Sequence, residues 1–149
     1  MKRHIILLIA FVLMSAQLFA QTPVYLTKAY KPVESDRYTA YSSLEIQGGD
    51  TWNNCFTLGV INNYHGYATF NIGGKYESIS FILGAEKSNG GNDPNIVQIH
   101  ADGRRIFDYV LRDGDLSQHF TLNISGVDKL EFSLVKPEVE PAFCEVALW

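Results

Sequence analysis

After residue 20, apolar and polar residues alternate in short runs, and no stretch follows the period of a helix. The clearest run is 76–84, in which Ile79, Phe81 and Leu83 fall on one side of an extended chain. Alternation of this kind predicts strands with one buried face. Further strands are expected at 24–29, 55–60, 67–72, 95–101, 104–111, 119–124, 129–135 and 142–149, with a short one as an option at 44–47.

Turn residues separate these runs. Asp102-Gly103 stands between two alternating runs, which is a strong hairpin signal because a type I′ turn needs positive φ at both central positions. Gly73-Gly74 marks another turn, and 62–66 is expected to be a loop. About nine strands at this spacing predict an all-β fold, a single antiparallel β-sandwich or jelly roll. The last run is expected to be paired within a sheet, because a free edge of that composition would aggregate.

The first twenty residues have the order of a secretory signal peptide. Lys2 and Arg3 precede an apolar run from Ile5 to Met14, and a stretch of small and mildly polar residues ends at Ala20. The apolar run is shorter than the roughly 20 residues that a membrane span needs. We therefore expect export to the periplasm or the medium, with 21–149 as one domain and no membrane insertion after cleavage; an uncleaved anchor is the alternative.

Charge and motifs narrow the class of function. The chain has 12 basic and 16 acidic residues, and without Lys2 and Arg3 the balance is 10 against 16, or −6. An acidic domain without a basic cluster is a poor partner for nucleic acid or anionic membranes. Nucleophile elbows, HExxH, phosphate-binding loops and zinc-spaced Cys/His pairs are absent from the sequence. We therefore predict a protein that is not an enzyme and has no catalytic residues.

The two cysteines, Cys55 and Cys144, allow two interpretations. In an exported protein they could form a disulfide, which would add about 4–5 kcal/mol to stability in the chain-entropy model. Strict alternation, however, places Cys55 opposite the apolar face of its strand and places Cys144 on the same face as Val146 and Leu148. Buried free thiols are the alternative.

Aromatic and amide residues gather in two neighbouring stretches, TWNNC and NNYHGY. An aromatic ring can stack on the apolar face of a sugar, while amide and imidazole groups bond to its hydroxyls. The structural alternative is that the aromatic residues cap the core of the sandwich. The candidate carbohydrate-binding residues are Trp52, Asn53, Asn54, Tyr64, His65 and Tyr67.

The stretch between the strands at 76–84 and 95–101 is rich in Asn, Gly and Asp. Ca²⁺ takes six to eight oxygen ligands, and the candidate metal ligands here are Glu86, Asn89, Asn92 and Asp93. The spacing matches no EF-hand. A long turn, with Pro94 fixing a corner, is the structural alternative.

Four runs, in this order and spacing, resemble the NPCBM family of carbohydrate-binding modules, which occur beside glycoside hydrolases. They are FNIGGKYESISFILGAE, NGGNDPNIVQIHADGRRIFDYVL, FTLNISGVDKLEFSLV and AFCEVALW, and the resemblance covers about 55–149. It implies a galactose-binding-like β-sandwich that recognises a glycan without catalysis, with galactose-type sugars among the candidates, through loops at one end. It also implies a structural Ca²⁺ in the loop after Gly84, where Lys87 replaces an acid that the family often has.

The sequence therefore predicts an exported, non-catalytic carbohydrate-binding module, which could belong to a larger glycan-processing assembly. The alternative is a protein–protein interaction module of an envelope or secreted assembly with no glycan affinity.

Overall fold

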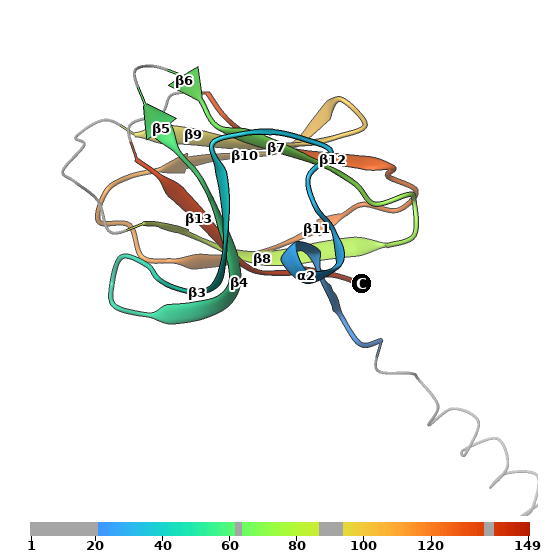
Figure 1. Ribbon diagram of the computed structural model, residues 1–149, viewed down its shortest axis with the longest axis horizontal. Helices are drawn as coiled ribbons and strands as arrows, with labels where there is room; N and C mark the ends of the chain where they lie inside the picture. Colours follow the sequence, from blue (N-terminus) through green and yellow to red (C-terminus); the bar gives the residue numbers. More distant parts are fainter. Residues whose placement is uncertain (1–20, 62–63, 87–93, 136–138) are drawn as a thin grey trace, which may run out of the picture.

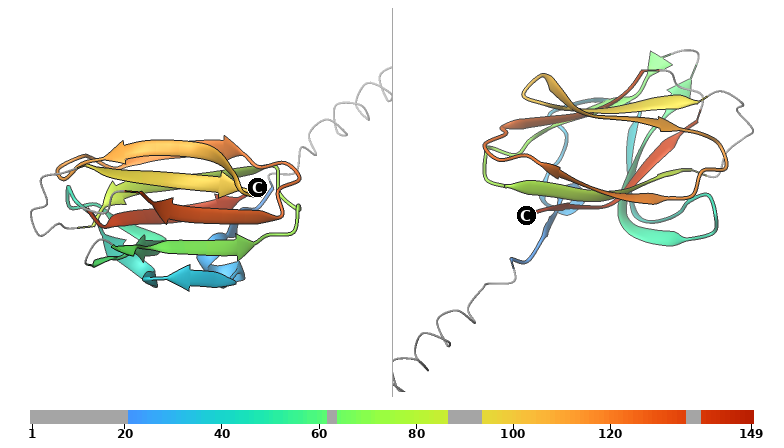
Figure 2. Two further views of the ribbon diagram at one scale, coloured as in Figure 1. Left: turned by 90° about the horizontal axis from the view of Figure 1, so that it is seen from above. Right: turned by 180° about the vertical axis from the view of Figure 1, so that it is seen from behind.

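The computed structural model describes residues 21–61, 64–86, 94–135 and 139–149, which form two antiparallel sheets packed face to face (Figures 1 and 2). The predicted signal peptide, 1–20, lies outside these residues. Among the described residues, no helix is long and apolar enough to cross a membrane.

The first sheet, called the β13 sheet here, has the strand order β11-β8-β13-β4-β3, and β1 pairs with the far end of β13. Its strands are β11 (Gln118–Asn123), β8 (Ser78–Ala85), β13 (Pro141–Leu148), β4 (Thr51–Leu58), β3 (Tyr38–Glu45) and β1 (Val24–Tyr25). The central position of β13 confirms that the last strand is paired within a sheet.

The second sheet, called the β9 sheet, has the order β10-β9-β12-β7-β2. Its strands are β10 (Arg104–Leu111), β9 (Asn95–Ala101), β12 (Lys129–Leu134), β7 (Tyr67–Asn71) and β2 (Glu34–Asp36). A small separate hairpin of β5 (Val60–Ile61) and β6 (Tyr64–His65) follows β4. The predicted antiparallel β-sandwich is confirmed.

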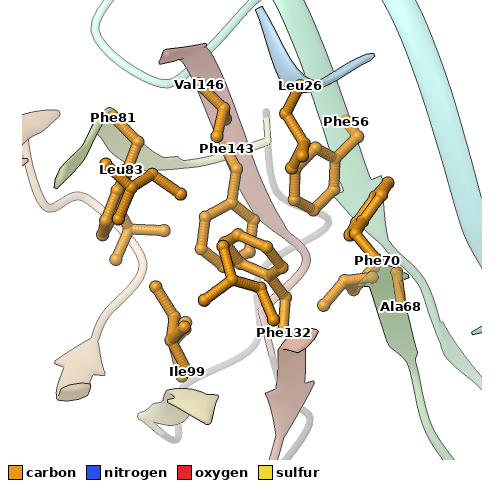
Figure 3. Close-up of a cluster of buried hydrophobic side chains, with 14 of the residues drawn as sticks. Leu26, Phe56, Ala68, Phe70, Phe81, Leu83, Ile99, Phe132, Phe143 and Val146 are labelled. Carbon is orange, nitrogen blue, oxygen red and sulfur yellow. The ribbon is translucent and has the colours of Figure 1, made fainter. Parts of the chain in front are cut away.

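Phenylalanines from both sheets fill the space between them (Figure 3). Phe56 of β4 and Phe143 of β13 stack with ring centroids 4.9 Å apart, and Phe132 of β12 meets both rings edge-on. Ile79, Phe81 and Leu83 are buried in the same cluster, as the alternation in β8 predicts. Burial of these rings is the main stabilising contribution to the sandwich.

The β9–β10 hairpin forms as predicted. Asp102 has a φ of 48° and Gly103 a φ of 80°, so both central residues lie in the left-handed region that a type I′ turn requires. The Asp102 carboxylate also accepts a hydrogen bond from the backbone N–H of Lys129 at 2.8 Å, which fastens the turn to the start of β12.

The N-terminal part differs from the prediction. The strand expected at 24–29 is only two residues long, and a single helical turn, α2 (Leu26–Ala29), follows it and buries Leu26 beside Phe56 (Figure 3). The region 31–50 was expected to be irregular apart from 44–47, yet it forms β2 and the eight-residue β3. Both strands lie at sheet edges and have exposed polar residues, so their apolar alternation is weak. The loop expected at 62–66 contains β6.

Candidate functional site

A disulfide joins Cys55 of β4 to Cys144 of β13, which resolves the alternatives that the sequence left open. Both cysteines lie on the outer side of the β13 sheet, away from the β9 sheet, in a small apolar group called the outer cluster: Ile46, Cys55, Ile82, Ala142 and Cys144. The expectation that Cys144 shares a face with Val146 and Leu148 is therefore wrong.

A bulge in β13 explains the error. Glu145 has a φ of 48°, and the pairing of β13 with β8 shifts by one residue between Cys144 and Ala147. One extra residue reverses the alternation, so Phe143 and Val146 both face the core although they are three residues apart. A left-handed, non-glycine residue in a central strand is uncommon and often lies at a functional site.

A second left-handed residue, Asn54, faces this bulge. The pairing of Phe56 with Phe143, followed by the disulfide, places Asn54 (φ 51°) opposite Glu145. Asn54 likewise reverses the alternation of β4, so that Trp52 packs against the same outer cluster as Cys55. The backbone N–H of Asn53 donates a hydrogen bond to Glu145 Oε1 at 3.1 Å.

Beyond the disulfide, β4 and β13 separate, and β1 becomes the partner of β13 through Val24–Leu148 and Tyr25–Ala147. An open depression of about 570 Å³, called the wedge hollow, lies at this fork. Its lining is polar and aromatic, with one cation and one anion: Tyr25, Thr27, Lys28, Ala40, Tyr41, Ser42, Asn53, Asn54 and Glu145. The Lys28 ammonium lies 5.4 Å from the centroid of the Tyr25 ring, within cation–π range.

A smaller depression of about 250 Å³, called the Trp52 hollow, lies on the other side of Glu145. Trp52 reaches across the outer side of the sheet to His119 of β11, and the two rings meet edge-on with centroids 5.7 Å apart. The hollow is lined by Trp52, Ser80, Phe81, Ile82, His119, Phe120, Thr121 and Glu145. Glu145 is thus the residue that the two hollows share.

The structure brings together only part of the predicted sugar site. Trp52, Asn53 and Asn54 lie around Glu145, at the start of β4. Tyr64 and His65 belong to the β5–β6 hairpin beyond the other end of β4, and Tyr67 begins β7 in the β9 sheet (Figure 1). The seven residues from Trp52 to Leu58 span about 20 Å of extended chain. The two aromatic stretches therefore do not form one surface.

Sequence reasoning missed most of the lining of these hollows, including Lys28, Tyr41, His119 and Glu145. Lys28 was assigned to a strand, and Tyr41 to an irregular region. His119 becomes a neighbour of Trp52 only through sheet order. One signal was available for Glu145, since it is the only charged residue in the run Pro141–Leu148.

Three of the four predicted metal ligands, Asn89, Asn92 and Asp93, lie outside the described residues. Glu86 is described, and its carboxyl lies beside that of Glu140. Two carboxylates suit a hard cation such as Ca²⁺, which takes six to eight oxygens. Within the described ranges, however, no three His, Cys, Asp or Glu side chains form a group that could hold a metal ion. The calcium site stays a prediction.

The pKa of Glu86 is raised, first because burial disfavours its charged form and second because of the Glu140 carboxyl. Because its pKa is raised in the folded state, Glu86 contributes stability that is fully present below its ordinary pKa of about 4.5. This contribution is lost as the pH rises through the raised pKa. Glu86→Gln, which resembles the protonated form, should therefore match the parent protein at pH 4 and exceed its stability at pH 7.5. We expect a gain of at most about 1 kcal/mol, since the pair is partly solvated.

Urea unfolding of both proteins at the two pH values, with EDTA present to exclude metal effects, measures this difference. Glu34→Gln, which removes an exposed carboxyl from β2 in the other sheet, is the control for the loss of one negative charge. Equal stability of Glu86→Gln and its parent at pH 7.5 would contradict the prediction.

Comparison with known proteins assigns the chain to a family. Residues 15–147 match the family model of the NPCBM/NEW2 domain, so the chain belongs to this family. The match confirms the resemblance drawn from 55–149 and extends it over most of the N-terminal part. A sequence comparison with curated proteins finds no match.

Several solved CBM51 modules have a similar fold. The CBM51 of GH95 from Clostridium perfringens, solved in complex with methyl-galactose, has a TM-score of 0.66 at 13% identity; the similarity covers 86% of this chain and 100% of that one. The tandem CBM51 modules of the family 98 glycoside hydrolase from Streptococcus pneumoniae SP3-BS71 give 0.67 at 12% identity, over 85% of this chain and 47% of theirs.

The CBM51-2 and INT domains of Clostridium perfringens ZmpB, solved with GlcNAc, give a TM-score of 0.65 at 8% identity, over 85% of this chain and 31% of that one. The chain thus spans a whole CBM51 module but less than half of the two longer structures. At these identities the similarity shows a shared fold and does not transfer binding residues.

Proposed function

We propose that this domain binds glycans, without catalysing a reaction, through the outer face of the β13 sheet around Glu145. Membership of the NPCBM/NEW2 family and the CBM51 fold support a carbohydrate-binding class. The observation that carries the location is the pair of left-handed residues, Asn54 and Glu145, which face each other between two hollows. Such backbone costs on the order of 1–3 kcal/mol per residue, and the disulfide beside it helps to hold it in place.

The chemistry of the wedge hollow suits a sugar. Hydroxyl groups both donate and accept, and this hollow offers a carboxylate acceptor, an ammonium donor and two amides within one lining. Tyr25 and Tyr41 add apolar ring surface for the C–H face of a pyranose. Galactose and GlcNAc are the first candidates, because CBM51 modules of the same fold were solved with methyl-galactose and with GlcNAc.

Glu145→Gly separates binding from folding. Glycine adopts a φ of 48° without steric cost, so the variant should keep the parent's free energy of unfolding within about 1 kcal/mol. The same change removes the carboxylate from both hollows, and we expect glycan binding to fall at least about tenfold. A glycan array identifies the ligand, and calorimetric titration with the strongest hit measures the loss.

His65→Ala is the matched control, because His65 is an exposed predicted sugar residue on the distant β5–β6 hairpin. Binding that His65→Ala abolishes and Glu145→Gly preserves would move the site to that end of the sandwich. A folded protein without any array hit would contradict glycan binding and favour the protein–protein interaction module.

Export is part of the proposal. Residues 1–20 have the composition of a signal peptide, and the Cys55–Cys144 disulfide suits an oxidising compartment. The domain would then meet glycans outside the cytoplasm, alone or in an assembly with glycan-processing enzymes. Determining the N-terminal residue of the mature protein tests this part, and Gln21 is expected if cleavage follows Ala20.

A further inference from the structure

We propose that the glycan site has two subsites, one on each side of Glu145, so that the preferred ligand is an oligosaccharide of at least two sugar units lying across β13. This inference rests on the proposed function and deepens it. It follows from the position of Glu145, whose side chain lines both the wedge hollow and the Trp52 hollow.

The two hollows are adjacent because sheet order makes them so. The wedge hollow lies on the β4 and β3 side of β13, and the Trp52 hollow lies on the β8 and β11 side. Two strand spacings, about 10 Å, separate these two sides. This is about the length of a disaccharide, so neighbouring sugar units of one chain could fill both hollows at the same time.

The lining differs between the two hollows in a way that fits two roles. The wedge hollow has about 570 Å³ and includes Lys28, Asn53 and Asn54, which can hydrogen-bond a terminal sugar from several sides. The Trp52 hollow has about 250 Å³ and presents an aromatic pair, Trp52 and His119, with the hydroxyl of Thr121 beside it. Rings of this kind stack on a sugar with little demand on its identity.

Glu145 can serve both subsites. Its Oε1 accepts a hydrogen bond from the Asn53 backbone N–H at 3.1 Å, which fixes the carboxylate. An ionised carboxylate has about four acceptor positions, so most of them stay available for hydroxyls on either side. The covalent Cys55–Cys144 link, directly before the bulge, fixes β4 against β13. Both subsites are therefore formed before the ligand arrives, which lowers the entropic cost of binding.

The test compares the strongest oligosaccharide hit of a glycan array with the methyl glycoside of its terminal sugar, both titrated calorimetrically into the mature protein. We expect the oligosaccharide to bind at least about tenfold tighter. Asn53→Ala, in the wedge hollow, should weaken both ligands by a similar factor. His119→Ala, in the Trp52 hollow, should weaken only the oligosaccharide and bring the two affinities within about threefold of each other.

The outcomes separate the two proposals. Equal affinities of the oligosaccharide and the methyl glycoside overturn the two-subsite inference and leave glycan binding intact. The inference also fails if His119→Ala weakens both ligands alike, or neither. A folded protein with no array hit overturns the inference together with the proposed function. The thermal midpoint of each variant is measured first, and His119 is a suitable target because it is exposed.

Discussion

Replacing both Cys55 and Cys144 by alanine is expected to lower the free energy of unfolding by about 4–5 kcal/mol. The disulfide closes a loop with a sequence separation of 89, so its loss frees a large part of the unfolded chain. It also joins β4 to β13 just before the point where the two strands separate. A whole domain of this size is stable by only about 5–15 kcal/mol, so the variant should be close to the limit of folding at 37 °C.

Urea unfolding with and without a strong reductant provides the control for this prediction. The parent protein should lose stability when the reductant cleaves its disulfide, whereas the double alanine variant should not respond to the reductant. Glycan binding by the variant, measured at 10 °C where a destabilised domain has the best chance to be folded, reports whether the disulfide also holds the bulge. A stability loss below about 1 kcal/mol would show that the bridge contributes little beyond the strand pairing.

The fold was predictable where local signals agree with sheet position. In β9, residues 95–101 alternate between the core and solvent, and Asp102-Gly103 supplies the turn that the hairpin needs. These signals are local, so one sequence is enough to interpret them. The N-terminal part was not predictable in the same way. Residues 38–45 form an edge strand with one partner, β4, and its exposed polar residues hide the alternation.

The candidate site was predictable only in part, because it forms around two left-handed residues, one of them at a bulge. Alternation predicts where side chains point only while the chain keeps the period of two, and Asn54 and Glu145 both interrupt that period. Glutamate gives no local sign of a left-handed conformation, whereas asparagine adopts it more readily. Trp52 is a predicted residue that lines one of the hollows, but its neighbour His119 lies 67 positions later and meets it only through the order of the strands.

The same bulge allows one strand to serve the core and the surface. Without it, Val146 and Leu148 would follow Cys144 to the outer side, and the core would lose two apolar side chains. With it, Phe143, Val146 and Leu148 all face the β9 sheet, while Glu145 lies between the two hollows. A local backbone cost in β13 is thus offset by burial on one side and creates a polar site on the other.

Phe143→Ala is expected to lower the free energy of unfolding by about 3–5 kcal/mol, the usual range for a fully buried phenylalanine. The Phe143 ring is 0% exposed, stacks on Phe56, and meets Phe81 and Phe132 from the two sheets. Alanine would leave a cavity at the centre of this cluster (Figure 3). Urea unfolding of the parent and the variant measures the loss.

Two further variants show whether this loss comes from the cavity. Phe143→Leu keeps most of the side-chain volume and should lose much less than Phe143→Ala. Val110→Ala, at a position that is 39% exposed on the edge strand β10, should change stability by less than about 1 kcal/mol. Equal losses for the alanine and leucine variants at Phe143 would contradict the explanation by a cavity. They would indicate that the shape of the aromatic stack with Phe56 sets the stability of β13. In that case Phe143→Leu should also weaken glycan binding, because β13 also carries Glu145. If the cavity alone causes the loss of stability, the glycan affinity of the folded fraction should be unchanged.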